Sequence, residues 1–208
     1  HNNGKTLNTV HNVLSEQDYS IRYRVLRTSE YGGIPQIRDR IYIVAFREQE
    51  DCDSFVFPDK TDLNITIEDI LNRTVKKNEV YYYSLDDPFY RKASQIVKRH
   101  DSIYRVYHNS IKITQNHMCP TLTASMGISK NQVPLIVDDY GLRKLTLKEC
   151  LDFQGFPSEF YFPNTITIED AYKQIGNSVC VPVIRRIADN MRVICMYRCD
   201  TNSIGKII

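Results

Sequence analysis

The run IYIVAF at residues 41–46 decides the fold class, because six apolar residues in succession are typical of a strand covered on both faces. Upstream of it, apolar and polar residues alternate over residues 21–25, which predicts a half-buried strand. Residues 4–16 carry apolar side chains at helical spacing and are expected to form a helix. Together these elements indicate part of an α/β layered sheet. Because so few strands cannot complete a sheet, we expect the end portion of a larger domain.

Regular structure is expected again in the last part of the chain. Thr146 and Glu149 are spaced as a capping box, in which each side chain binds the other residue's backbone amide. A helix should therefore begin there and end before Gly155. Further strands are expected at residues 121–124 and 133–137, and further helices at residues 167–176 and from residue 182 onward.

Composition excludes several classes of protein. Apolar residues make up 42% and charged residues 25% of the chain, as in a soluble globular protein. The longest charge-free stretch, residues 113–129, is rich in Thr, Asn, Gln and Ser, which excludes a membrane span. The eight glycines never form a G-x-G, so a dinucleotide fingerprint and a phosphate-binding P-loop are absent. The six cysteines are too dilute for a disulfide scaffold and, like the five histidines, lack zinc-ligand spacing, so we expect reduced thiols, an intracellular protein and no metal.

Charge changes sign along the middle of the chain. Residues 47–70 carry two basic and eight acidic residues, a net of −6, and residues 71–116 carry nine basic and four acidic residues, a net of +5. The second stretch also holds six of the fourteen tyrosines. Basic residues interleaved with aromatic ones suit a nucleic-acid surface. A solvated helix over residues 86–100 followed by an amphipathic strand explains the same pattern, so both interpretations stay open.

Two arginines, Arg38 and Arg40, stand two residues apart in the segment GIPQIRDR at residues 33–40. Strands that leave an α/β sheet place such residues at a ligand crevice. The planar guanidinium suits a phosphate or a polarised carbonyl oxygen. Pairing with carboxylates at the sheet edge is the alternative that the residues alone leave open.

Three segments in this order resemble the last three signature motifs of the DNA (cytosine-5) methyltransferases: GIPQIRDR at residues 33–40, RKLTLKECLDFQGFP at 143–157 and YKQIGNSVCVP at 172–182. In addition, MCPTLTAS at residues 118–125 resembles the Pro-Thr-Leu-Thr segment of that family's target-recognition region, and HNNGKTL at residues 1–7 resembles the stretch after its Glu-Asn-Val motif. The pair Gly32-Gly33 departs from the family pattern by one extra glycine.

The resemblance implies a fold and a division into parts. The fold would be the end portion of a methyltransferase-type mixed sheet with flanking helices, plus a small irregular β-rich target-recognition domain, incomplete as a single chain. Residues 1–47 would be the C-terminal part of the catalytic α/β domain, residues 48–141 the target-recognition region, and residues 142–208 the motif-bearing helices that return to the catalytic domain.

Three parts of the family's machinery are missing from the sequence. The family's nucleophile is the cysteine of a Pro-Cys motif, and no cysteine here follows a proline. The Phe-x-Gly-x-Gly cofactor loop and the Glu-Asn-Val glutamate are missing as well. All three lie N-terminal to this region in the family, so the resemblance implies the C-terminal half of the enzyme, either as one subunit of a split enzyme or as a truncated product. We expect it to be inactive without an N-terminal half and to bury an apolar interface against it.

The resemblance also implies a reaction: a methyl group is transferred from S-adenosylmethionine to C5 of a cytosine that is flipped out of double-stranded DNA. The residues implied in catalysis are Arg40, which would hold the flipped base, and Gln36 and Arg38, which would brace the catalytic loop and the DNA backbone. A structural bracing role is implied for Arg143 and Glu149.

Other residues are implied in binding. Thr121 and Thr123, with Arg38, would contact DNA. The implied contacts with S-adenosylmethionine come from Asn177 and Ser178, which by themselves also fit a plain helix N-cap.

Two other functions stay open: a non-catalytic homologue that binds DNA or stimulates a partner, and a tRNA cytosine-5 methyltransferase. The intact motif residues named above argue against a degenerate homologue. The resemblance further implies a bacterial restriction–modification setting, a cytoplasmic location near the nucleoid and no membrane partner.

Overall fold

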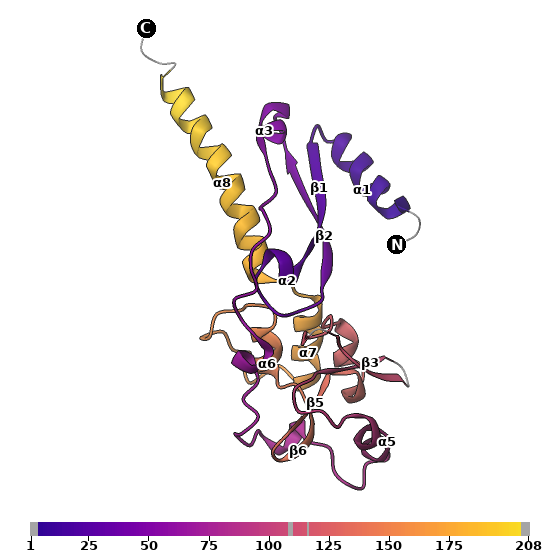
Figure 1. Cartoon of the computed structure of the whole chain (residues 1–208). Helices are drawn as coiled ribbons and strands as arrows, with labels where there is room; N and C mark the ends of the chain where they lie inside the picture. The colour runs from indigo at the N-terminus through magenta and orange to yellow at the C-terminus, as the bar shows by residue number, and fades with distance from the viewer. Residues whose placement is uncertain (1–3, 108–109, 116, 205–208) are drawn as a thin grey trace. The chain divides into compact units, whose positions relative to one another are not determined.

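The computed structural model describes residues 4–107, 110–115 and 117–204, and the chain divides into two compact units. The first unit is formed by the described parts of residues 1–26, 39–60 and 183–208, and the second by those of residues 27–38 and 61–182. Both units combine helices with strands (Figure 1), which confirms the expected α/β class.

The first unit contains a two-stranded sheet of β1 and β2. Its elements are α1 at Lys5–Ser15, β1 at Ser20–Arg27, β2 at Asp39–Phe46, α3 at Gln49–Ser54 and α8 at Val181–Ile204. Pro182 is the second residue of α8, where a missing amide hydrogen costs no helical bond. The helix, the strand at residues 21–25 and the long final helix expected from the sequence are thereby present. The expected half-burial of that strand is wrong, because Tyr23 and Val25 are exposed.

Aromatic packing fills the interior of the first unit. The rings of Phe46 and Phe55 lie 5.6 Å apart, and Phe55 meets the edge of Phe57 at 5.0 Å. All three side chains are buried. Asn190 of α8 donates from Nδ2 to the carbonyl oxygen of Val56 at 2.8 Å, which fixes the final helix to this segment.

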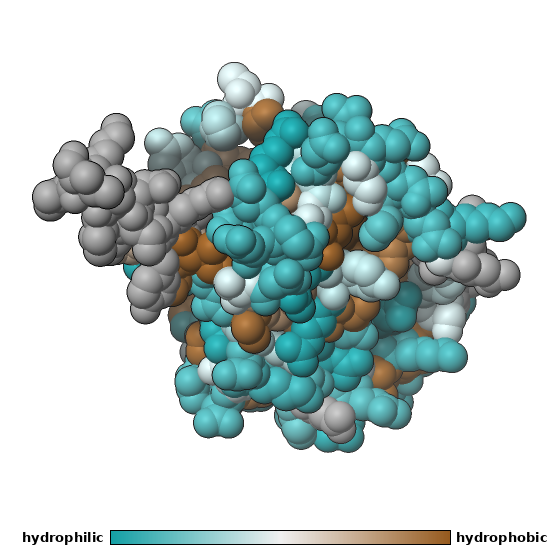
Figure 2. Space-filling view, turned by 90° about the horizontal axis from the view of Figure 1, so that it is seen from above, coloured by the Kyte–Doolittle hydropathy of each residue, from teal (hydrophilic) through white to brown (hydrophobic). Residues whose placement is uncertain are grey.

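Burial along β2 corrects the expectation of a strand covered on both faces. Tyr42, Val44 and Phe46 are buried, whereas Ile41 is 45% and Ile43 36% exposed. Burial thus alternates along the strand, as in a sheet with one packed face and one face open to solvent. Figure 2 shows hydrophobic residues (brown) at the surface between hydrophilic ones (teal).

The second unit carries a four-stranded antiparallel sheet in the order β4-β3-β5-β6. The strands are β3 at Tyr104–Tyr107, β4 at Ser110–Ile113, β5 at Leu135–Asp138 and β6 at Gly141–Lys144. The expected strand at residues 133–137 is confirmed by β5. The strand expected at residues 121–124 is wrong, because this segment runs into the 3-10 helix η3 at Ala124–Gly127 and packs on a helix instead of pairing in the sheet.

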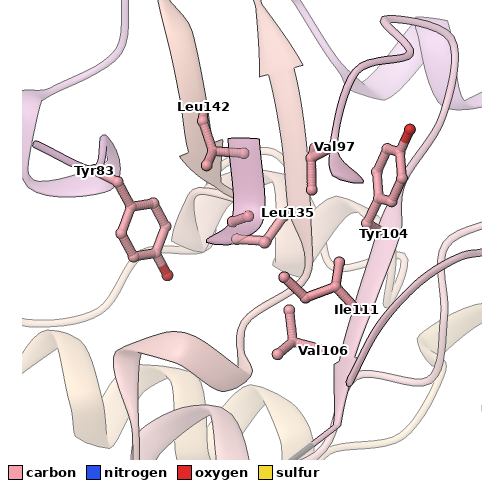
Figure 3. Close-up of a cluster of buried hydrophobic side chains, with 8 residues drawn as sticks. Tyr83, Val97, Tyr104, Val106, Ile111, Leu135 and Leu142 are labelled. Atoms are coloured by element: carbon pink, nitrogen blue, oxygen red, sulfur yellow. The ribbon is translucent and has the colours of Figure 1, made fainter. Parts of the chain in front are cut away.

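The core of this sheet is a cluster of buried apolar side chains, shown in Figure 3. Its members are Tyr83, Ala93, Val97, Tyr104, Val106, Ile111, Leu135 and Leu142. Ala93 comes from α5 at Pro88–Ile96, whose N-cap Asp87 accepts a hydrogen bond from the backbone of Phe89 at 2.8 Å. The helix expected within residues 86–100 is therefore present, and it packs on one side of the four-stranded sheet.

The remaining helices of the second unit begin and end at the signals that the sequence carries. The Thr146–Glu149 capping box is present with both bonds, at 3.1 and 2.7 Å, and opens α6 at Leu147–Asp152. Gly155 follows with a φ of 71°, a left-handed conformation that favours glycine. Helix α7 spans Ile168–Asn177, and short helical turns lie at Thr28–Tyr31, Ile67–Ile70, Glu79–Tyr81 and Lys130–Gln132.

Candidate nucleic-acid and cofactor site

Gln36 fixes the segment before β2 to the interior of the second unit. Its side chain is fully buried and donates from Nε2 to the carbonyl oxygen of Phe153 at 2.9 Å. The neighbouring backbone pairs with Cys119: Ile37 donates to the Cys119 carbonyl at 2.8 Å, and Cys119 donates to that of Pro35 at 2.7 Å. This pairing places the Gln-x-Arg motif beside the start of the Pro-Thr-Leu-Thr segment.

Arg38 joins three segments that are distant in sequence. Its side chain is 2% exposed, and its Nη1 donates to the carbonyl oxygen of Leu122 at 2.5 Å. Its Nη2 donates to the carbonyl oxygens of Gly176 at 3.1 Å and Ser178 at 2.5 Å. Since a guanidinium stays charged in proteins, these carbonyl dipoles offset the cost of burying it. Arg38 thus contacts protein backbone in this structure, and its role is to hold the three predicted segments together.

The backbone of α7 lies directly against the Thr-Leu-Thr segment, and Gly176 allows this approach. A Cβ atom at Gly176 would lie 2.1 Å from the carbonyl carbon of Thr123 and 2.3 Å from the nitrogen of Ala124. On the other side of the contact, a Cβ at Gly127 would lie 2.3 Å from the carbonyl oxygen of Glu169. Two glycines therefore set the distance between the predicted DNA-contacting and cofactor-contacting segments.

Thr121 and Thr123 are half-buried and line one pocket of about 140 Å³. Thr121 donates from Oγ1 to the carbonyl oxygen of Ile37 at 2.5 Å. The hydroxyl oxygens of Thr123 and Ser125 are 2.7 Å apart and share a hydrogen bond. Both threonines are thereby held at a partly open surface, with their remaining lone pairs available to a donor.

Asn177 and Ser178 close α7. Asn177 is its last residue and is exposed, while Ser178 is its C-cap and donates from Oγ to the carbonyl oxygen of Ile175 at 2.6 Å. The interpretation of the pair as a helix N-cap is wrong, because α8 begins three residues after Ser178 and the Ser178 hydroxyl faces the preceding turn. The exposed carboxamide of Asn177 is the group here that is open to a ligand.

Arg40 lies in the first unit, at the start of β2. Its side chain is half-buried, and its Nη1 donates to the carbonyl oxygen of Asp39 at 2.8 Å. Among the described residues it forms no carboxylate pair, so pairing at the sheet edge, the alternative open from the sequence, is not what the structure shows for Arg40.

A buried charge network underlies the second unit. Arg143 is fully buried, pairs with Asp138 at 2.6 Å, and forms two bonds to Glu149 at 2.8 and 2.7 Å. The hydroxyl of Tyr82 donates to Asp138 at 2.9 Å. Burial alone would lower the pKa of Arg143, but the bonds to Glu149 and Asp138 raise it above its usual value. The network joins β5 and β6 to α6, in agreement with the bracing role expected of Arg143 and Glu149.

Sequence reasoning missed Asp138 and Tyr82 in this network. Asp138 accepts from the backbone amides of Tyr140 at 2.9 Å and Gly141 at 3.1 Å, as an aspartate at the start of a turn does. The aspartates and the glycine at residues 138–141 are typical of a turn. This pattern does not distinguish a turn at the surface from one whose aspartate binds a buried arginine.

The cysteines whose side chains the structure describes are buried and free: Cys52, Cys119, Cys150 and Cys180. Burial raises the pKa of the Cys119 thiol, and likewise that of Cys150, well above the usual range. A thiol must ionise and reach solvent to act as a nucleophile. These two therefore cannot serve as one in this structure.

Within the described ranges, no group of three or more His, Cys, Asp or Glu side chains could hold a metal ion. In the same part of the chain, no helix has the length and apolar character required to cross a membrane.

Comparison with known proteins places these features in a family. The family model described as C-5 cytosine-specific DNA methylase matches residues 1–192. The type II methyltransferase M.Bsp6I of Bacillus sp. strain RFL6 is 41% identical over 192 residues, which cover 92% of this chain and 61% of that protein. The type II methyltransferase M.SsoII of Shigella sonnei is 31% identical over 200 residues, with 92% and 49% covered.

Solved structures agree in fold. The Entamoeba histolytica methyltransferase EhMeth superposes with a TM-score of 0.64 at 19% identity, covering 90% of this chain and 57% of that one. Dnmt2 methyltransferase of S. pombe gives a TM-score of 0.62 at 18% identity, with 90% and 62% covered. The chain thus spans about half to three-fifths of the length of these proteins.

Proposed function

The chain belongs to the C-5 cytosine-specific DNA methylases, and we propose that it forms part of an enzyme that methylates C5 of a flipped cytosine in double-stranded DNA. The observation that carries this proposal is the junction at Arg38. One buried guanidinium binds the backbone of both the Thr-Leu-Thr segment and the Gly-Asn-Ser segment, so a DNA-contacting and a cofactor-contacting surface are held together.

The chemistry requires a nucleophile from outside the described residues. Carbon C5 of cytosine is a poor nucleophile, and a thiolate that adds to C6 raises the electron density at C5. The new C5–methyl bond then forms as the methyl–sulfur bond of the donor breaks, and loss of the C5 proton expels the thiolate. Because the thiols of Cys52, Cys119, Cys150 and Cys180 are all buried, we infer that an N-terminal methyltransferase half supplies this thiolate along with the glycine-rich cofactor loop.

The residues proposed for catalysis differ in what they can touch. Arg40 has a partly exposed guanidinium, which suits the charge that develops at the cytosine carbonyl oxygen during attack. Gln36 and Arg38 are buried, so they act by positioning: Gln36 ties the motif to Phe153, and Arg38 ties it to Leu122 and Ser178. The exposure of these side chains supports a direct contact with the base for Arg40 and a positioning role for Gln36 and Arg38.

The hydrogen-bonding groups at the end of α7 suit S-adenosylmethionine. Its amino acid part needs hydrogen-bonding partners, and Asn177 offers an exposed carboxamide that can both donate and accept. Ser178 already uses its hydroxyl hydrogen and its carbonyl, so it contributes an acceptor and holds Asn177 in place. When bound, the cofactor supplies the electrophilic methyl group.

For DNA contact we propose Thr121 and Thr123, whose side chains line an open pocket next to the Gln-x-Arg motif. The target-recognition region would span residues 48–141, between a catalytic part at 1–47 and the motif-bearing helices at 142–208. The boundaries of these functional parts differ from those of the two compact units. Each functional part is one continuous segment, whereas the first unit contains residues from both ends of the chain.

We further infer that the exposed apolar side chains of the first unit mark the interface with the N-terminal half. Val25 is 60%, Tyr23 52% and Ile41 45% exposed on the two strands. A sheet with an open apolar face is stable in water only when another surface covers it. The similarity to bacterial type II methyltransferases supports a restriction–modification setting.

The test is methyl transfer by the enzyme purified from its native source, with labelled S-adenosylmethionine and either duplex DNA or tRNA. We expect label at C5 of cytosine in DNA, and denaturing mass spectrometry of the same sample to detect a polypeptide segment with a Pro-Cys motif. DNA binding without transfer would establish the non-catalytic alternative, and label in tRNA alone would establish an RNA methyltransferase.

A further inference from the structure

The exposed face of the β3–β4 hairpin carries two cations directly opposite each other. In the antiparallel register of these strands Arg105 pairs with Lys112, and both side chains are exposed. Like charges at opposite positions of a sheet repel each other and destabilise the pair. No acidic partner of either residue occurs among the described residues, so the hairpin itself does not balance this charge.

Arg105 also lies at a pocket that it shares with uncharged residues, both polar and apolar. The guanidinium lies 5.2 Å from the centre of the Tyr107 ring, close enough for a cation–π contact that restricts its orientation. Both residues line the pocket that contains Thr121, Thr123, Ser125 and Gln132. A guanidinium whose orientation is restricted by a ring presents its planar fork in a fixed direction, which suits the two acceptors on the edge of a base.

The hairpin has the form that a DNA groove admits. A two-stranded antiparallel ribbon fits the major groove, and the fork of an arginine matches the O6 and N7 acceptors of guanine. A lysine beside it acts as a point charge toward a phosphate. The two cations on this face therefore suit two different parts of one duplex.

We propose that the β3–β4 hairpin enters the major groove of the target DNA, where Arg105 reads a guanine of the recognised sequence and Lys112 binds a phosphate. This inference rests on the proposed function and assigns it a specificity-determining residue. Arg105 and Lys112 alternate along the strands with Val106 and Ile111, which are buried in the apolar cluster, so the side chains that read DNA stand on a packed sheet.

The experiment uses the native enzyme and a pool of duplexes with randomised sequence around cytosine, in which methylated molecules are identified by sequencing. Arg105→Ala should lower the preference for guanine at one position by roughly 5- to 150-fold and leave the other preferences unchanged. Lys112→Ala should weaken binding of all sequences and reduce the slope of log affinity against log salt by about 0.9.

Arg91→Ala is the matched control, since this exposed arginine of α5 does not line the pocket and its loss should keep the recognised sequence. Unchanged base preferences with Arg105→Ala would overturn the inference, as would an equal loss on all sequences with a reduced salt slope, which identifies a phosphate contact. Failure of the unaltered enzyme to methylate any duplex would instead overturn the proposed function.

Discussion

Arg143 and Glu149 form a two-pronged ion pair, in which Nη1 and Nη2 donate to the two carboxylate oxygens at 2.8 and 2.7 Å. The arginine side chain is 0% and the glutamate side chain 5% exposed. Glu149 also accepts from the backbone amide of Thr146, so one carboxylate caps α6 and neutralises the arginine that stands on β6. The capping box and the buried ion pair therefore depend on the same side chain.

Glu149→Ala should lower the free energy of unfolding by about 3–5 kcal/mol, because it removes the two-pronged bond to Glu149 and leaves the buried Arg143 with Asp138 as its remaining carboxylate partner. Lys148→Ala is the control: it removes the neighbouring pair with Asp152 on the same helix, where the lysine is 50% exposed. That loss should cost at most about 1 kcal/mol. Urea denaturation of the native enzyme measures both. Equal effects of the two substitutions would contradict the structural role given to the buried pair.

Gly176→Ala should destabilise the protein by roughly 1–3 kcal/mol, since its methyl group would overlap backbone atoms of Thr123 and Ala124 that cannot move aside independently. The control is Gln174→Ala, an exposed position on the same helix, which should stay within about 0.5 kcal/mol of the unaltered protein. Thermal unfolding checks the pair. If Gly176→Ala proved as mild as the control, the close approach of α7 to the Thr-Leu-Thr segment would not exist.

Local signals predicted much of this fold. The Thr146 capping box, the glycine at 155 and the proline at 182 each act within a few residues, and the helices begin and end there as expected. The motif segments could also be recognised, because their order along the chain is visible without a structure. The buried contacts of Arg38 and Gln36 with these segments could not be predicted, since they join residues 84 to 140 positions apart.

Two expectations failed for one physical reason. Whether β2 is covered on both faces, and whether residues 121–124 form a strand, depends on what lies beside them. Ile43 stays 36% exposed although residues of α8 line a pocket beside it, and Thr123 pairs in no sheet because Gly176 lets α7 contact its backbone. The pattern of apolar and polar side chains indicates which structure a segment favours. Whether the segment adopts that structure depends on contacts with residues from distant parts of the chain.

Alkaline pH should destabilise the protein. Burial raises the pKa of Cys119 and of Cys150 in the folded state, whereas an unfolded chain loses these protons near about pH 8.5. Above that pH the unfolded state binds fewer protons than the native state, so the free energy of unfolding falls as the pH rises. The unfolding equilibrium constant should increase about tenfold per pH unit for each thiol.

Urea denaturation between about pH 8.5 and 9.5, below the pKa of tyrosine in an unfolded chain, keeps the contribution of the buried tyrosines to this pH dependence small. Cys150→Ala removes one of these thiols. It should therefore make the free energy of unfolding fall less steeply with pH, whatever its effect on the stability at a fixed pH. A slope that does not change would show that Cys150 titrates alike in the two states.

Arg40→Ala should reduce methyl transfer by about 10²–10³-fold, because it removes the cation proposed to meet charge at the cytosine carbonyl. Binding of S-adenosylmethionine, which we assign to the end of α7, should change little. Single-turnover transfer and equilibrium binding of the cofactor to the same preparation separate the two. Equal losses in both measurements would mean that Arg40 acts on the fold or on the cofactor. Arg40→Lys should recover only part of the rate, since an ammonium lacks the planar fork.

Ile43→Lys should weaken the association of this chain with the N-terminal half that we propose. Ile43 lies on the sheet of the first unit and is 36% exposed, so a lysine there places a charge in an apolar interface without disturbing a closed core. Leu85→Lys is the control, because Leu85 is 71% exposed in the second unit. Co-purification of separately expressed halves, followed by analytical ultracentrifugation, measures the association.

The 208-residue chain without its partner should self-associate through the same surface, and Ile43→Lys should reduce this self-association. A chain that is monomeric and unfolds cooperatively by itself would show that the exposed strand needs no partner.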